Sequence, residues 1–135
     1  MPELNDFDLA LLLGPNFAHL ATIDRRGAPR STVTWVDADA ETGHVLINSA
    51  IGRAKDADIR RDPRVSVSVH EQGDGYRYVA IQGVVEAFMT GEEADRHIDF
   101  LNRKYHDGEP WTFRAGQERV IYRIRPERII RYDDD

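Results

Sequence analysis

The chain has 135 residues, a formal net charge of −6 and no cysteine. Its length suits one domain over residues 1–135, its acidity argues against general nucleic-acid binding, and the missing cysteines exclude disulfides and thiolate chemistry. The apolar run Leu9–Leu13 is too short to span a bilayer or to form a secretory core, so we expect a cytoplasmic protein without a membrane segment.

The first fifty residues predict one helix and three strands. Asn5 starts a helix over residues 5–13, with Asp8 at its third position and Gly14-Pro15 as its stop signal. Alternating apolar residues between turn signals then predict strands over 17–24, 30–37 and 44–49. The polar segment 37–43 predicts a loop.

A second short helix is predicted over residues 53–61. It ends at Asp62-Pro63, because the residue before a proline avoids the helical region. Strict alternation of valine and polar residues then predicts a strand over 64–70, and a long apolar run predicts another over 76–89. Gly83 marks a bend or bulge in that long strand.

The last third predicts a third helix, over residues 91–106, and a final strand region. Thr90 and Glu93 match a capping box. The helix carries an apolar stripe at helical spacing, made of Ala94, Ile98, Leu101 and Tyr105. Two strand pieces, 119–125 and 128–132, flank Pro126, and the acidic tail 133–135 is expected to fray.

These elements favour a mainly β fold with helices, in which six or seven antiparallel strands form a closed or nearly closed barrel. The strand over 76–89 carries apolar residues on both faces. One face can fill the barrel, but the single stripe of the following helix cannot cover the other. A two-fold interface would bury it, so we expect a homodimer.

Positive charge gathers in residues 53–64, which hold five cations and three acids in an otherwise acidic chain. Arg53 and Lys55 stand at the start of a predicted helix, where the helix dipole disfavours cations. One interpretation is a phosphate site, because helix N–H groups bind anions and a guanidinium such as Arg61 holds phosphate with two hydrogen bonds. The other is a solvated surface helix.

Other residues carry weaker signals. The five histidines show no HExxH motif and no paired metal spacing, so no metal site is expected. Ser49 lacks the context of a nucleophile elbow. His70 is a candidate for lining a groove, Trp35 either packs or contacts a ring, and Trp111 either shields a pocket or anchors its loop.

Three segments share an order and spacing typical of one superfamily: LATIDRRGAP over 20–29, RAKDADIRRDPR over 53–64 and GYRYVAIQG over 75–83. Over residues 6–132 the chain resembles the pyridoxamine 5'-phosphate oxidase-like, FMN-binding split-barrel superfamily, and most of all its small coenzyme F420-dependent reductases of actinobacteria. True oxidases of that superfamily carry a C-terminal Arg–Leu segment for substrate. This chain ends RIIRYDDD instead, so vitamin B6 oxidation is not expected.

The resemblance implies a cofactor site. The phosphate would be held by Arg53, Ala54, Lys55 and Arg61. The strand end beside phosphate and ring would be Asn48, Ser49 and Ala50. The strand 29–34 would lie under the isoalloxazine-like ring, through Pro29, Ser31, Thr32 and Val33. The second subunit of the homodimer would contribute Gly75, Tyr76, Arg77 and Tyr78.

The implied activity is that of an F420H2-dependent oxidoreductase, which transfers hydride to an electron-poor small molecule such as an enone, quinone or tetrapyrrole. Because the cofactor carries the chemistry, no side chain is named as catalytic, and Tyr76 or a bound water is the candidate proton donor. Two alternatives stay open: an FMN-dependent oxidoreductase, and an F420- or flavin-binding protein without turnover. Arg30 and Arg60 favour F420, whose tail carries carboxylates.

Overall fold

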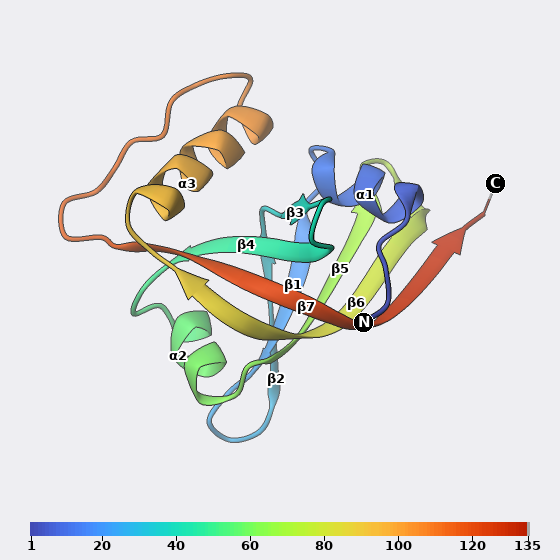
Figure 1. The fold of residues 1–135 in the computed structure, drawn as a ribbon, viewed down its shortest axis with the longest axis horizontal. Coiled ribbons are helices and arrows are strands. Elements are labelled where there is room, and N and C mark those ends of the chain that lie inside the picture. Colours follow the sequence, from blue (N-terminus) through green and yellow to red (C-terminus); the bar gives the residue numbers. More distant parts are fainter. Residues whose placement is uncertain (135) are drawn as a thin grey trace.

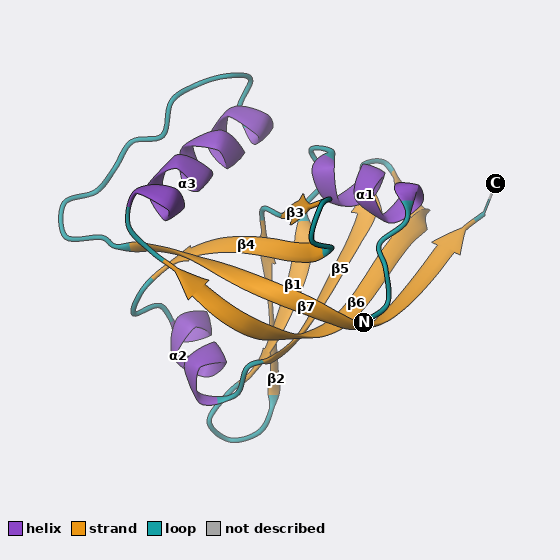
Figure 2. Cartoon of the chain, in the orientation of Figure 1, coloured by secondary structure: helices purple, strands orange, loops and turns teal. Residues whose placement is uncertain are grey.

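In the computed structural model, which describes residues 1–134, seven antiparallel strands form one strongly curved sheet, and three helices lie around it (Figures 1 and 2). The helices are α1 (Asp6–Leu13), α2 (Ala54–Arg61) and α3 (Glu92–Tyr105). The strands are β1 (Ala18–Ile23), β2 (Pro29–Thr34), β3 (Asp37–Asp39), β4 (His44–Ala50), β5 (Arg64–Glu71), β6 (Asp74–Met89) and β7 (Arg119–Asp133). Their order in the sheet is β2-β1-β5-β6-β7-β4-β3, which confirms the mainly β split-barrel prediction.

The core is one cluster of apolar side chains from the sheet and from α1 and α2. The alternation predicted for β5 is confirmed, because Val65, Val67 and Val69 are buried. They join apolar side chains from β1, β4, β6 and β7 in one cluster. Asn5 caps α1 as expected, since its side chain accepts from the Asp8 backbone N–H and the Asp8 carboxylate accepts from that of Asn5. No helix in residues 1–134 is long and apolar enough to cross a membrane.

Strand β7 runs unbroken through Pro126, where the sequence predicted two pieces. Pro126 pairs with Gly83 of β6, next to a shift in register between Gln82 and Gly83. A proline lacks the N–H that a regular ladder needs, and the bulge at Gly83 removes that need. The two long strands can therefore cross the whole sheet and form its centre.

Gly83→Ala is expected to lower the free energy of unfolding by about 2 kcal/mol, in the range for overpacked sites. A Cβ there would stand 2.5 Å from the Arg125 carbonyl oxygen, and backbone cannot easily move away. Gly75→Ala is the matched control, because it lies on the same strand with no atom within 4 Å of its added Cβ. Urea unfolding of both variants tests this, and equal stabilities would contradict the packing argument.

Three local predictions were wrong. Asp37–Asp39 forms strand β3 against β4, although it was predicted as loop, because three polar-flanked residues are too short to show alternation. Gly91 is the N-cap of α3, with φ 75° and no side-chain cap, so Thr90 and Glu93 make no capping box. Asp133 belongs to β7 and pairs with Arg77 at 2.6 Å instead of fraying. Of the predicted frayed tail, residue 135 lies outside the described residues.

Helix α3 is held against the rest of the fold by Lys104. Its Nζ donates to the carbonyl oxygens of Leu12, at 3.0 Å, and Val36, at 2.7 Å. Burial lowers the pKa of this ammonium to about 8. Lys104 thereby joins the end of α1 and the β2–β3 connection to α3. The β2–β3 connection and α3 each contribute to the lining of the site described next.

Candidate functional site

Helix α2 is fixed to the sheet by two buried carboxylates. Asp56 accepts hydrogen bonds from the Tyr122 hydroxyl at 2.7 Å, Arg60 Nε at 3.0 Å and the Gly52 N–H at 3.1 Å. Burial raises the pKa of Asp56, but these hydrogen bonds outweigh it and hold the pKa below its ordinary value.

The second carboxylate, Asp58, faces β1 and β2. It accepts from Thr22 Oγ1 at 2.8 Å, Arg30 Nε at 3.0 Å and Arg61 Nη2 at 3.1 Å. Arg61 also donates to the carbonyl oxygen of Ile23, at 3.4 Å. The helix is thus tied to β7 through Asp56 and to β1 and β2 through Asp58, which sets where its first turn points.

The cations around α2 fall into two groups. Arg60, Arg61 and Arg64 each pair with a carboxylate. Arg53 and Lys55 have no carboxylate within 4.0 Å among residues 1–134. Burial lowers the pKa of Lys55, and the charges of Arg53 and Arg119 lower it further. The unpaired cations therefore stand at the start of the helix, where the backbone also lacks a cap.

Arg53 is the N-cap of α2, and no side chain caps the helix there. The first N–H groups of a helix have no intrahelical acceptor and favour a bound anion. Uncapped N–H groups beside unpaired cations are the arrangement that a phosphate group requires. The residues present at the start of α2 therefore fit the phosphate of a flavin-type cofactor.

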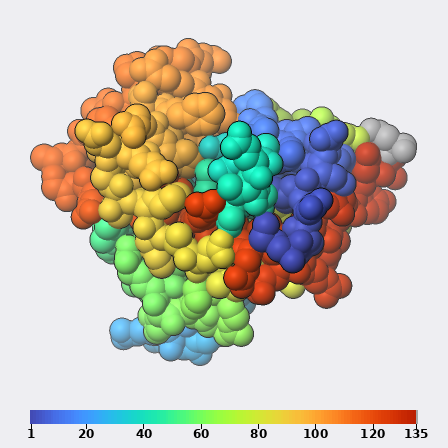
Figure 3. Space-filling model, viewed as in Figure 1, coloured from blue at the N-terminus to red at the C-terminus, as the bar shows by residue number. Residues whose placement is uncertain are grey.

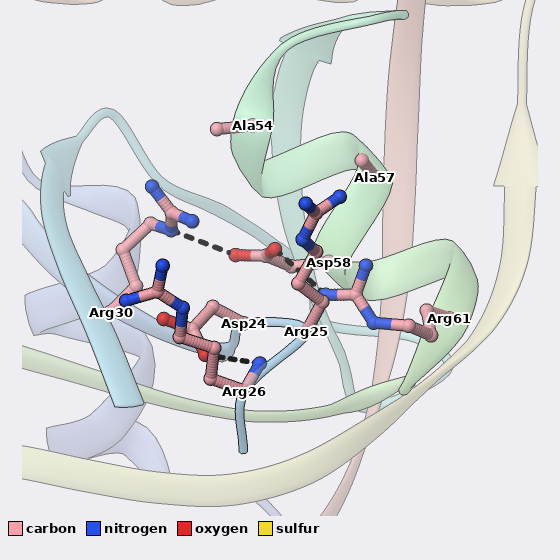
Figure 4. Close-up of a pocket in the computed structure, with 8 residues that line it drawn as sticks. All are labelled: Asp24, Arg25, Arg26, Arg30, Ala54, Ala57, Asp58 and Arg61. Atoms are coloured by element: carbon pink, nitrogen blue, oxygen red, sulfur yellow. Dashed lines mark hydrogen bonds and ion pairs between the residues drawn. The ribbon is translucent and has the colours of Figure 1, made fainter. Parts of the chain in front are cut away.

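Two hollows flank this helix start. The aromatic hollow, of about 230 Å³, is lined by Phe17, Val33, Thr34, Trp35, Asn48, Arg53, Lys55, Ile98, Trp111 and Arg119. The arginine hollow, of about 460 Å³, is lined by Asp24, Arg25, Arg26, Arg30, Ala54, Ala57, Asp58 and Arg61 (Figure 4). In the space-filling view the β1–β2 turn lies against α2 at one end of the molecule (Figure 3).

The arginine hollow brings four guanidinium groups together with two carboxylates (Figure 4). Arg30 and Arg61 converge on Asp58 from opposite sides, and Arg25 and Arg26 come from the β1–β2 turn. The Asp24 carboxylate accepts from the backbone N–H of Arg26 at 2.9 Å, so this bond leaves the Arg26 guanidinium unused. The hollow keeps an excess of positive charge, which suits a ligand with several carboxylates.

The aromatic hollow has a stacked wall. Trp35 lies parallel to Tyr105, with ring centroids 5.2 Å apart, and Trp111 meets Trp35 edge-on at 6.1 Å. Trp35 therefore both packs on a neighbour and lines the hollow, and Trp111 lines it from the loop between α3 and β7.

Arg119 is a site residue that the sequence did not single out, as are Arg25 and Arg26 of the arginine hollow. It is buried at the start of β7, where its Nε donates to Asn48 Oδ1 at 3.0 Å and its Nη1 to Gln117 Oε1 at 3.2 Å. Burial and the nearby charge of Arg53 lower its pKa to about 10. It reaches the hollow because β7 pairs with β4, a long-range contact that no local pattern reveals.

Most of the residues expected at the phosphate and ring do gather around α2. Asn48, Arg53, Lys55 and Val33 line the aromatic hollow, and Ala54 and Arg61 line the arginine hollow. Ser49 and Ala50 are buried at the end of β4. On β2, Pro29 and Ser31 are exposed, and the buried Oγ1 of Thr32 has no hydrogen-bond partner.

Other expected residues lie outside the two hollows. Gly75, Tyr76, Arg77 and Tyr78 stand at the end of β6 that is remote from α2 (Figure 1). Tyr76 is 68% exposed. His70 contacts the Glu71 carbonyl oxygen through Nδ1 and lines a separate depression with Tyr78. Arg60 is bound to Asp56 and lies over the Phe88 ring.

Comparison with known proteins agrees with this architecture. The sequence profile of the pyridoxamine 5'-phosphate oxidase family matches residues 4–132. A solved structure named F420 reductase is 30% identical, with a TM-score of 0.78, 96% of this chain covered and 98% of that one. A conserved hypothetical protein from Mycobacterium tuberculosis is 25% identical, with a TM-score of 0.72 and 98% and 85% covered.

A more distant structure, general stress protein 26 from Bacillus anthracis, shares the fold at 20% identity, with a TM-score of 0.67 and 93% and 91% covered. The profile match spans nearly all of the sheet and all three helices. The chain therefore belongs to the pyridoxamine 5'-phosphate oxidase family and has its split-barrel fold, which is the fold of flavin- and F420-dependent oxidoreductases.

Proposed function

We propose that the protein is an F420H2-dependent oxidoreductase that reduces an electron-poor small molecule. The observation that carries this proposal is the start of α2, where uncapped helix N–H groups meet Arg53 and Lys55 without a carboxylate partner in residues 1–134. This is a site for the phosphate of the cofactor. Similarity to a protein named F420 reductase supports the class of reaction.

The arginine hollow favours F420 over FMN. Both cofactors carry a phosphate, so the start of α2 alone does not separate them. Only the F420 tail carries carboxylates, and four arginines line the hollow directly beside the helix start. Arg30 and Arg61 would contact the tail through the N–H groups that do not bind Asp58, since each guanidinium has five.

The residues of this chain would bind and orient the cofactor. Arg53, Ala54, Lys55 and Arg61 would hold its phosphate, Asn48, Ser49 and Ala50 would lie beside phosphate and ring, and Pro29, Ser31, Thr32 and Val33 of β2 would support the ring. When bound, the cofactor supplies the hydride. The aromatic wall excludes water, and Tyr76 or a bound water remains the candidate proton donor.

Turnover with reduced F420 tests the proposed activity. Anaerobic mixing of protein, reduced F420 and a quinone or enone acceptor should regenerate the absorbance of oxidised F420 faster than the protein-free reaction. Tight binding without turnover of any acceptor would favour the binding-protein alternative. Turnover with reduced FMN and none with reduced F420 would favour the FMN-dependent alternative.

We also propose a homodimer with the cofactor sites at the interface. Exposed apolar side chains remain on the sheet and around it, among them Val33, Phe88, Ile130 and Tyr132. Within one chain Gly75–Tyr78 lie far from α2 (Figure 1). A partner would have to bring its own copy of that segment to the site, as the family resemblance implies. A single domain and a cytoplasmic location stay predictions as well.

Mixing two defective chains is expected to restore binding if the site is shared. Lys55→Ala removes a phosphate contact from one half, and Tyr76→Asp spoils the other half. A mixed dimer then holds about one intact site of two, and random exchange makes about half of the dimers mixed. Cofactor binding should therefore recover to about a quarter of the wild-type stoichiometry. No recovery between two folded variants, or a monomer by light scattering at micromolar concentration, would count against the shared site.

A further inference from the structure

We propose that Arg119 is an anion-binding residue of the aromatic hollow, and that Asn48 and His97 are the positioning residues that aim it. The ligand group is an oxyanion on a flat molecule, either a carboxylate of the substrate or the phosphate of the cofactor. This inference rests on the proposed function, because it assumes that the hollow takes a ligand of that reaction.

The charge of Arg119 has no carboxylate partner within residues 1–134. Its side chain is 4% exposed, and it has no carboxylate within 4.0 Å in the part of the chain that is described. A guanidinium has five N–H groups, and among the described residues only two of them find acceptors, on Asn48 and Gln117. Burying an unpaired charge is costly, so an anion in the hollow would stabilise this arrangement.

Asn48 fixes the direction of that guanidinium. Its Oδ1 accepts from Arg119 Nε at 3.0 Å, while its Nδ2 donates to the Ala94 carbonyl oxygen at 3.0 Å. A donor on one side and an acceptor on the other leave the amide one orientation. The same Nδ2 then donates to His97 Nδ1 at 3.1 Å.

His97, from α3, extends this series of hydrogen bonds to Asp37. Because Nδ1 must accept from Asn48, the ring carries its proton on Nε2, which donates to Asp37 Oδ2 at 3.0 Å. The four residues Asp37, His97, Asn48 and Arg119 come from β3, α3, β4 and β7. This hydrogen-bonded series locks the buried cation in one place, as a binding site for a defined group requires.

The walls of the hollow suit a flat apolar body. Trp111 lies under the Arg119 guanidinium, with 5.3 Å from the central carbon to the ring centroid, and Trp35 stands edge-on to Trp111. Phe17, Val33 and Ile98 complete an apolar lining. A planar ring between these surfaces would direct its acid group to Arg119.

Two pairs of ligands that differ only in their anion test the proposal. The first pair is 2-naphthoate and 2-naphthamide, and the second is FMN and riboflavin. Calorimetric titration gives the affinity ratio within each pair for the wild type, for Arg119→Met and for Arg114→Met. Arg114 is the matched control, because it is an exposed arginine in the loop before β7 and loses the same charge.

Arg119→Met should reduce the ratio at least tenfold in one pair, the size expected for a charge-assisted contact, while Arg114→Met leaves both ratios within about threefold of wild type. A drop in the naphthoate ratio identifies a substrate carboxylate, and a drop in the FMN ratio identifies the cofactor phosphate. No preference in the wild type, or unchanged ratios in Arg119→Met, would overturn the proposal. A carboxylate from a partner subunit that neutralises Arg119 would give that negative result.

The positioning role has its own readout. His97→Phe removes the acceptor for Asn48, whereas His97→Asn keeps an oxygen near the position of Nδ1. The ratio of affinities for the anionic and the uncharged ligand should fall in His97→Phe and stay close to the wild-type value in His97→Asn. The affinity for the uncharged ligand should be unchanged in both variants. Equal ratios in the two variants would refute the positioning role. These titrations need no turnover and leave Lys55 intact, so their failure is distinct from failure of the proposed function.

Discussion

Lys55→Ala is expected to weaken cofactor binding by between about tenfold and a hundredfold, with the free energy of unfolding nearly unchanged. A charge-assisted hydrogen bond to phosphate contributes about 1.5–3 kcal/mol, which converts to that range. Lys55 has no carboxylate partner in residues 1–134, so its removal leaves no buried acid unpaired. The neighbouring charges of Arg53 and Arg119 instead lose a repulsive contact.

Arg64→Ala is the matched control for this substitution. It removes one cation from the same charged window, but Arg64 is paired with Asp62 and its side chain is 70% exposed. Equilibrium titration at low salt, where surface electrostatics is strongest, compares the two. An equal loss of affinity in both variants would mean that only overall charge matters. No loss in Lys55→Ala would return the residue to the solvated-helix interpretation.

Asp56→Ala is expected to lower the free energy of unfolding by about 3 kcal/mol at pH 7, as for other buried ionic groups that lose their partner. Three donors would lose their acceptor: the Tyr122 hydroxyl, Arg60 and the Gly52 N–H. The start of α2 would lose its anchor to β7, so cofactor binding should weaken as well.

The loss of unfolding free energy in Asp56→Ala should depend on pH, and the pKa of Asp56 gives the direction. The pKa of Asp56 is lower in the native state than its ordinary 3.8, so its contribution is complete above that value and declines as the pH falls through the native pKa. The difference in unfolding free energy between wild type and Asp56→Ala should therefore become smaller below about pH 4. Tyr122→Phe removes one of the three donors to Asp56, and it should lower the free energy of unfolding by about 1 kcal/mol. A difference between wild type and Asp56→Ala that grows in acid would contradict the lowered pKa of Asp56.

Local patterns predicted most of the fold. Valine alternation identified β5, the Asn5 cap identified α1, and Gly83 marked the bulge in β6. The patterns missed features that depend on distant pairing. Pro126 stays inside β7 only because Gly83 lies opposite, and Asp37–Asp39 is a strand only because β4 is beside it.

Local sequence also predicted some residues of the site and missed others. Arg53 and Lys55 could be predicted because cations are unusual at a helix start, a signal contained within a few residues. Arg119 carries no such signal, since it is one of 16 arginines and reaches the hollow only through the pairing of β4 with β7. The sequence likewise could not show that Thr22 and Arg30 bind Asp58, because those contacts depend on how α2 packs on β1 and β2.

Equilibrium binding of oxidised F420 and of FMN to the purified apoprotein is the decisive measurement. In the proposed site, the uncapped start of α2 would hold the phosphate of either cofactor, and the arginine hollow would hold the tail of F420 alone. The structure predicts that both bind, that F420 binds more tightly, and that added salt reduces this advantage because it screens the exposed arginines. Clearly tighter binding of FMN, or no binding of either cofactor, would contradict the proposed F420 site.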